Sequence, residues 1–170
     1  MLTEPGFRFG PDTIVGVVPV KPVEVLYYKS LFLSRKIDFS SGQKAFALTA
    51  DGKVFGFVEY SFGEKAYSAK DTWYMLSDFP VEPKPHPKTS KLVLALARSA
   101  TVHKALDLSI LLRTKKVFTT AFTDKPVSMK YRGVFDLVKR GEGFLNYQAD
   151  WSSISAQETY AQWHQKFAKS

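Results

Sequence analysis

Two strands and the turn that joins them can be recognised in one run of the chain, Lys44-Ala-Phe-Ala-Leu-Thr-Ala-Asp-Gly-Lys-Val-Phe-Gly-Phe-Val-Glu-Tyr60. Residues 44–49 and 54–60 are rich in apolar side chains, several of them aromatic or β-branched, which is typical of strands. Asp51-Gly52 favours a tight hairpin turn, because both residue types tolerate the left-handed backbone that such a turn needs. We therefore predict an antiparallel hairpin here, and the other elements are placed around it.

Strands and helices alternate on both sides of this hairpin. Further strands are predicted at 14–20 (ending at Pro19), 71–79, 117–123, 135–138 and 144–147. Helices are predicted at 23–33, within 89–112, at 126–131 and at 155–167. Periodicity does not decide whether 89–112 is one helix or two. Residues 1–12 hold two Pro-Gly or Gly-Pro pairs and are predicted to form an extended arm. We predict one mixed α/β (α+β) domain over 1–170, not a doubly wound sheet, because no run of parallel βαβ units appears.

Composition excludes several classes of protein. Apolar residues make up 45% of the 170 residues and charged residues 24%, as in ordinary globular proteins. There is no cysteine, which excludes disulfides, thiolate metal sites and a thiol nucleophile. No apolar run is long enough to cross a membrane, and the N-terminal residues do not resemble a secretory signal. We expect a cytoplasmic protein, in the host cytoplasm if a phage encodes it, with no membrane partner.

Positive charge is concentrated in one part of the chain. Residues 84–140 contain 13 basic and three acidic residues, a balance of +10, whereas the whole chain carries +8. Such an excess indicates an anionic partner, such as a nucleotide, a phosphate-bearing cofactor or nucleic acid. The alternative is that the basic residues only solvate helix surfaces.

Three parts of the chain together indicate a family. They are the hairpin Ala45–Phe57, the pair of segments Ser77-Asp-Phe-Pro-Val81 and Lys88-Thr-Ser-Lys-Leu92, and the stretch Tyr131-Arg-Gly-Val-Phe135. These segments resemble the GNAT superfamily of acyl-CoA N-acyltransferases. The resemblance implies a mostly antiparallel central sheet with helices on both faces, and a splayed strand near residues 77–81. It also implies an N-acyltransferase that uses acyl-CoA, such as acetyl-CoA.

The resemblance places the cofactor's pyrophosphate at Lys88, Thr89, Ser90 and Lys91, with Val81 close by. The family's phosphate loop normally contains glycines, and none is present here. A helix N-terminus with free N–H groups, hydroxyls and lysine charges could still bind a pyrophosphate. The alternative is that Thr89 and Ser90 only cap a helix.

The resemblance also suggests the catalytic residues. Tyr131 matches the family's late tyrosine and is expected to protonate the leaving thiolate; otherwise it is a half-buried aromatic residue. Asp78 is expected to accept the amine proton, although it could equally be a turn residue before Pro80. Ser128 is expected to hydrogen-bond the substrate or the thioester, unless it is an ordinary polar residue. His86 could serve as a base or a phosphate donor, or be an exposed loop residue.

The stretch 118–131 is similar to phage DNA-modification proteins of the Mom type, which implies an amino group of a DNA base as the acceptor. The nucleic-acid contacts expected on this basis are Lys115, Lys116, Lys125, Lys130 and Arg132. No HxxxH or HExxH spacing occurs, so no metal site is predicted. Two alternatives stay open: a basic nucleic-acid-binding protein without catalysis, and an interaction protein with an acidic partner. The sequence leaves the oligomeric state undetermined.

Overall fold

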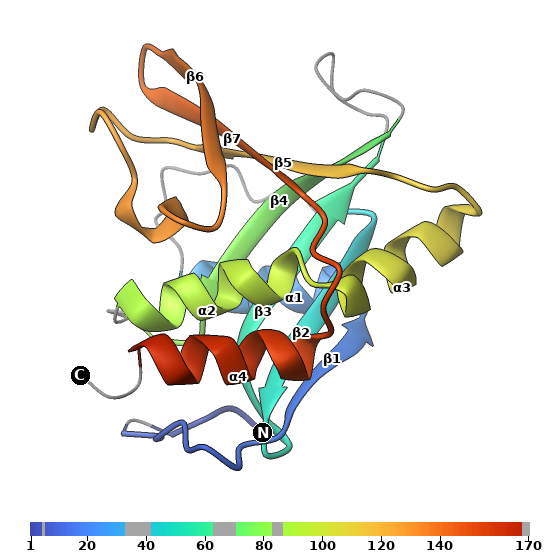
Figure 1. Cartoon of the computed structure of the whole chain (residues 1–170), viewed down its shortest axis with the longest axis vertical. Coiled ribbons are helices and arrows are strands. Elements are labelled where there is room, and N and C mark those ends of the chain that lie inside the picture. The colour runs from blue at the N-terminus through green and yellow to red at the C-terminus, as the bar shows by residue number, and fades with distance from the viewer. Residues whose placement is uncertain (5, 33–41, 63–70, 83–86, 168–170) are drawn as a thin grey trace.

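A seven-stranded sheet forms the centre of the protein (Figure 1). The computed structural model describes residues 1–4, 6–32, 42–62, 71–82 and 87–167. Across the sheet the strands lie in the order β1-β2-β3-β4-β5-β7-β6. Their bounds are β1 Val15–Val20, β2 Lys44–Ala50, β3 Lys53–Ser61, β4 Thr72–Pro80, β5 Lys116–Ala121, β6 Asp136–Gly141 and β7 Phe144–Asp150. Neighbouring strands are antiparallel except β4 and β5, which are parallel.

The predicted hairpin is confirmed. β2 and β3 pair antiparallel up to Ala50 and Lys53, which enclose Asp51 and Gly52. The φ angles of Asp51 and Gly52 are 50° and 80°. Positive φ at both central residues is what a type I′ turn requires. The two hairpin strands lie second and third in the sheet, so the Asp51-Gly52 turn identifies two of its interior strands.

Helices cover both faces of the sheet, as the resemblance implied (Figure 1). Helix α1 (Pro22–Phe32) covers one face, where Val25 packs with Phe57 and Phe79. Helices α2 (Pro87–Ala97), α3 (Ala100–Ile110) and α4 (Ala156–Phe167) contribute to the larger core on the other face. There Leu92 of α2 and Tyr160 of α4 belong to one buried cluster with Leu48 and Val58 of the hairpin.

Helix α1 has an unusual distribution of side chains. Its outer surface exposes Val23, Tyr27 and Leu31, each more than half exposed. Its inner surface buries Lys29, whose Nζ forms an ion pair with the carboxylate of Glu59 on β3. Buried charges are tolerated only when they are paired, so this contact ties the helix to the sheet at one point.

Two sequence predictions need correction, and one question that periodicity left open is answered. The strand β1 does not end at Pro19 but continues to Val20; a proline is tolerated there because β1 is an edge strand. The segment 89–112 forms two helices, because Ser99 interrupts the first and its hydroxyl accepts the N–H of Val102 as the N-cap of α3. The short helix predicted at 126–131 is a single 3₁₀ turn, η1 (Met129–Tyr131).

The N-terminal arm is held against the body of the protein. The N–H of Thr3 donates to the Val54 carbonyl, and the N–H of Val54 donates to the Met1 carbonyl. Phe9 packs edge-on against Phe55 and Trp163, with ring centroids 5.2 and 5.4 Å away. The arm therefore completes the core between the hairpin and α4.

Candidate active site

Strands β4 and β5 are paired at one end only. Their parallel pairing joins residues 72–74 to residues 116–118 and stops there, although β4 continues to Pro80 and β5 to Ala121. Beyond this point the two strands diverge (Figure 1), and Oγ1 of Thr119 donates to the Met75 carbonyl at 2.9 Å where they separate. A cavity of about 230 Å³ lies between the diverging ends and the segment that follows β5. We call it the split cavity; it lies in the part of the sheet where the resemblance implied a splayed strand.

Two charged side chains and a tyrosine meet in the split cavity. Nζ of Lys130 lies 2.7 Å from Oδ1 of Asp78, and the hydroxyl of Tyr131 donates to Oδ2 of Asp78 at 3.4 Å. Asp78 comes from the diverging part of β4, and its partners come from η1, more than 50 residues later. The side chain of Asp78 is 9% exposed and that of Lys130 is 34% exposed. The structure thus brings together Asp78 and Tyr131, two of the residues predicted to be catalytic.

The surroundings keep the phenol of Tyr131 protonated. Burial raises the pKa of Tyr131, the carboxylate of Asp78 raises it further, and the ammonium of Lys130 opposes this only in part. Burial lowers the pKa of Lys130, but attraction to Asp78 and hydrogen bonding to it outweigh burial, so that the pKa of Lys130 is raised. At neutral pH the cavity therefore holds a neutral phenol, which donates a hydrogen bond to Asp78.

Ser128, the third predicted catalytic residue, also lines the split cavity. Its backbone N–H donates to the hydroxyl of Tyr147 at 2.9 Å. The ring of Tyr147 stacks on Tyr131 with centroids 4.3 Å apart. Tyr147 was not recognised from the sequence, yet it fixes both the loop that carries Ser128 and the ring of Tyr131.

The predicted phosphate-binding residues Lys88, Thr89, Ser90 and Lys91 lie in the first turns of α2, which begins at Pro87. Helix α2 packs against both β4 and η1, the two elements that supply the charged groups of the split cavity. Nζ of Lys88 donates to the carbonyl of Phe167 at 3.0 Å. Nζ of Lys91 donates to the carbonyl of Arg132. The first contact ties the N-terminal end of α2 to the C-terminal end of α4, and the second ties it to the residue after η1.

Two other predicted residues of this region have different surroundings. The side chain of Val81 packs in the apolar cluster beneath α1, so a cofactor could meet this residue only through its backbone. His86 lies outside the described residues.

The five basic residues predicted to contact nucleic acid do not form one patch. Lys115 and Lys116 lie at the start of β5, where that strand is paired with β4. Lys125 and Arg132 are exposed and follow the other end of β5. Lys130 is engaged with Asp78 inside the split cavity. One of the five predicted contacts thus lines the split cavity, two lie nearby in sequence after β5, and two lie at the opposite end of the strand.

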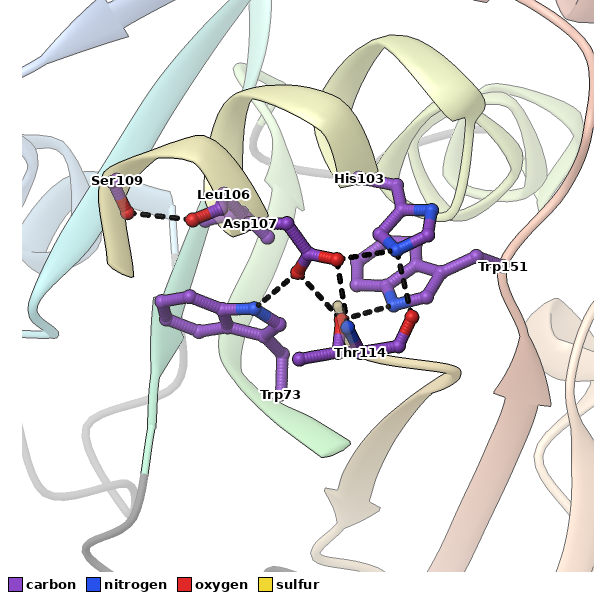
Figure 2. Close-up of polar contacts among 7 residues, drawn as sticks. All are labelled: Trp73, His103, Leu106, Asp107, Ser109, Thr114 and Trp151. Atoms are coloured by element: carbon purple, nitrogen blue, oxygen red, sulfur yellow. Dashed lines mark hydrogen bonds and ion pairs between the residues drawn. The ribbon is translucent and has the colours of Figure 1, made fainter. Parts of the chain in front are cut away.

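A network of hydrogen bonds secures the paired end of β4 and β5 (Figure 2). At its centre is Asp107 of α3. Its Oδ1 accepts from Nε1 of Trp73 at 3.2 Å and from Oγ1 of Thr114 at 2.6 Å. Its Oδ2 accepts from the Thr114 N–H at 2.7 Å and lies 2.8 Å from Nε2 of His103. Trp151 donates from its indole to Oγ1 of Thr114 at 3.0 Å and stacks on His103. We call these five residues the Asp107 network; no local pattern in the sequence indicates it.

Among the described residues, no group of three or more histidine, aspartate or glutamate side chains is placed to bind a metal ion. None of the helices in the described ranges combines the length and the apolar character needed to cross a bilayer.

Comparison with known families decides the assignment. The model of the phage GNAT-like domain matches residues 12–168. The chain belongs to this family and thus to the GNAT superfamily. The resemblance to the GNAT superfamily and the fold predicted from it are therefore confirmed. No curated protein matches the chain.

Solved acetyltransferase structures are similar to this chain at low identity. An acetyltransferase from Thermus thermophilus is 15% identical, with 80% of this chain and 96% of that chain covered and a TM-score of 0.47. The N-acetyltransferase PseH of Campylobacter jejuni, in complex with acetyl coenzyme A, is 9% identical, with 82% and 100% covered and a TM-score of 0.47.

Proposed function

We propose that this GNAT protein is an N-acyltransferase that takes its acyl group from an acyl-CoA thioester such as acetyl-CoA. The observation that carries the proposal is the meeting of Asp78, Lys130 and Tyr131 in the split between β4 and β5. A neutral proton donor and a carboxylate lie together there, in a cavity bounded by the family's characteristic sheet. Acyl transfer to an amine needs both groups, because one proton must leave the amine and one must reach the leaving sulfur.

The residues of α2 fit the phosphate end of such a donor. The first N–H groups of an α-helix have no partner within the helix, and its dipole favours anions at that end. In α2 this end carries Lys88 and Lys91 and no acidic residue in the first turn. We therefore assign Lys88, Thr89, Ser90 and Lys91 to the pyrophosphate. When bound, the donor supplies an acyl group activated as a thioester.

The roles of the split-cavity residues follow from their protonation. The carboxylate of Asp78 accepts a proton from the amine, directly or through water, as its nitrogen bonds to the acyl carbon. The carbon–sulfur bond then breaks, and the phenol of Tyr131 gives its proton to the departing thiolate. Lys130 holds Asp78 in place through their ion pair. The hydroxyl of Ser128 donates a hydrogen bond to the acyl oxygen or to the acceptor.

We further propose that the acceptor is an amino group on an anionic molecule, with a DNA base as in Mom-type modification as the specific case. The support is positive charge on the segment that follows β5 and contributes to the cavity lining: Lys125 and Arg132 are exposed there, within the stretch of +10. Such side chains neutralise phosphates, so binding to DNA is expected to weaken as salt is raised.

The direct test is release of free CoA thiol from acetyl-CoA, measured with duplex DNA and with a panel of small amines as acceptors. The DNA is then digested, and the masses of its bases are measured by mass spectrometry. Tyr131→Phe is expected to lower kcat about 10²- to 10⁴-fold, the usual contribution of a general acid. The matched control is Tyr27→Phe. Tyr27 is an exposed tyrosine on α1, which covers the face of the sheet opposite to α2.

The outcomes separate the open alternatives. Thiol release with small amines but not with DNA would keep the acyltransferase and remove the DNA acceptor. Binding of DNA without any thiol release would instead support a non-catalytic binding protein. Equal turnover of Tyr131→Phe and Tyr27→Phe would remove Tyr131 from the role of acid.

A further inference from the structure

A second cavity, of about 320 Å³, lies between α2, α4 and the segments 133–134 and 152–154. It shares no lining residue with the split cavity. Its volume is in the range of small-molecule sites. We call it the helix cavity; of its lining residues, the acyl-transfer proposal uses Lys91 alone.

The helix cavity is lined by cations without carboxylates. Lys91 of α2, Arg98 directly after α2 and Lys166 of α4 line it, and no aspartate or glutamate is among its lining residues. Nη1 of Arg98 donates to the Val134 carbonyl at 2.9 Å, which fixes the guanidinium plane. Nε of Arg98 is buried and has no hydrogen-bond partner within the described residues. A buried donor left unpaired is costly, so a ligand oxygen nearby would stabilise this arrangement.

The positive charges around this cavity act on one another. Burial lowers the pKa of Lys91, and the positive charges of Lys166 and Arg132 lower it further. Like charges held this close repel, and an anion between them removes the repulsion. The geometry and the charge therefore indicate the same kind of ligand.

We propose that the helix cavity binds the phosphate group of a nucleotide other than the acyl donor, through Arg98 and Lys166. Arginine offers planar N–H donors that match two phosphate oxygens, and lysine adds a mobile point charge. The apolar part of the lining, which includes Ala95 and Ile154, suits the less polar remainder of such a ligand. The proposal goes beyond acyl transfer and does not depend on it.

The test is calorimetric titration of the full chain with AMP and, separately, with inorganic pyrophosphate at low salt. Lys166→Gln removes an exposed charge and is expected to weaken AMP binding about two- to fivefold. Arg98→Gln removes a charged hydrogen-bond donor and is expected to weaken it about tenfold or more. Lys104→Gln, an exposed lysine on α3 away from the cavity, is the matched control and is expected to bind AMP as the unaltered chain does.

A repeat titration in saturating acetyl-CoA identifies the source of the phosphate. If AMP binds as before, the helix cavity serves a separate nucleotide, as proposed. If AMP no longer binds, the cavity holds the nucleotide end of the acyl donor and the proposal is overturned. It is also overturned if neither AMP nor pyrophosphate binds at millimolar concentration, or if Lys166→Gln binds AMP as tightly as Lys104→Gln. Since no turnover is measured, failure here leaves the acyltransferase proposal standing.

Discussion

Removing the carboxylate of Asp107 is expected to destabilise the protein strongly. In Asp107→Ala two buried N–H donors lose their acceptor: the indole N–H of Trp73, which is completely buried, and the backbone N–H of Thr114, which is 4% exposed. The hydroxyl of Thr114 loses its acceptor as well, but its hydrogen can rotate to another partner. A buried donor without a partner costs about 1–3 kcal/mol. His103 is partly exposed and can hydrogen-bond to water instead, so it contributes little to the loss of stability. We therefore expect a loss of about 3–5 kcal/mol, a large part of the roughly 5–15 kcal/mol that stabilises a domain.

Urea unfolding and thermal melting measure this loss. Unfolding entropies near 2.1 cal/mol/K per residue give about 0.36 kcal/mol per kelvin for a chain of this length, so the melting temperature is expected to fall by about 8–14 °C. Asp12→Ala, at an exposed position, is the control and should change stability by less than about 0.5 kcal/mol. A loss below about 1 kcal/mol for Asp107→Ala would show that water replaces the carboxylate. The Asp107 network would then not secure the paired end of β4 and β5.

Three further predictions concern stability. Because the pKa values of Tyr131 and Lys130 are raised by folding, both groups keep their protons longer in the folded state. Their contribution to the free energy of unfolding is complete below the pKa values of the unfolded chain, near pH 10, and is lost as the pH rises through the higher pKa values of the folded state. The urea midpoint should therefore fall above about pH 10, and it should fall less in Tyr131→Phe. Lys130→Met leaves the carboxylate of Asp78 without its ion partner and is expected to cost about 1–3 kcal/mol by urea titration; no loss would mean that water already solvates Asp78. Gly56→Ala places a Cβ 3.0 Å from Val93 Cγ2 of α2 and is expected to cost about 1–3 kcal/mol in thermal melts, so an unchanged melting temperature would show that α2 moves freely.

The sequence was most informative where the cause of a structure is local. Asp51 and Gly52 determine their own turn, and the hairpin followed from them. Pro19 was misread because its tolerance depends on β1 being at the sheet edge, which only the strand order reveals. The break between the two helices within 89–112 depends on Ser99 acting as an N-cap, which its backbone angles and its hydrogen bond with Val102 reveal.

The candidate site could be predicted only in part. Asp78 and Tyr131 were each chosen from the family resemblance, but no spacing in the chain shows that residues 53 apart share a hydrogen bond. For the same reason Lys130 was predicted as a nucleic-acid contact, although it pairs with Asp78. The Asp107 network joins α3 to the starts of β4 and β5 and the residue after β7, and each of its members alone is an ordinary polar or aromatic residue.

The side chains of α1 have a consequence for how that helix is oriented about its own axis. With Val23, Tyr27 and Leu31 outward, apolar residues lie on both its sides, so hydrophobic burial alone would tolerate several rotational settings. The ion pair between Lys29 and Glu59 can form in only one of these rotational settings. In any other setting Lys29 points away, and the carboxylate of Glu59 is left buried without a partner. In this helix a pair of charges, rather than apolar contact, selects the angle of docking.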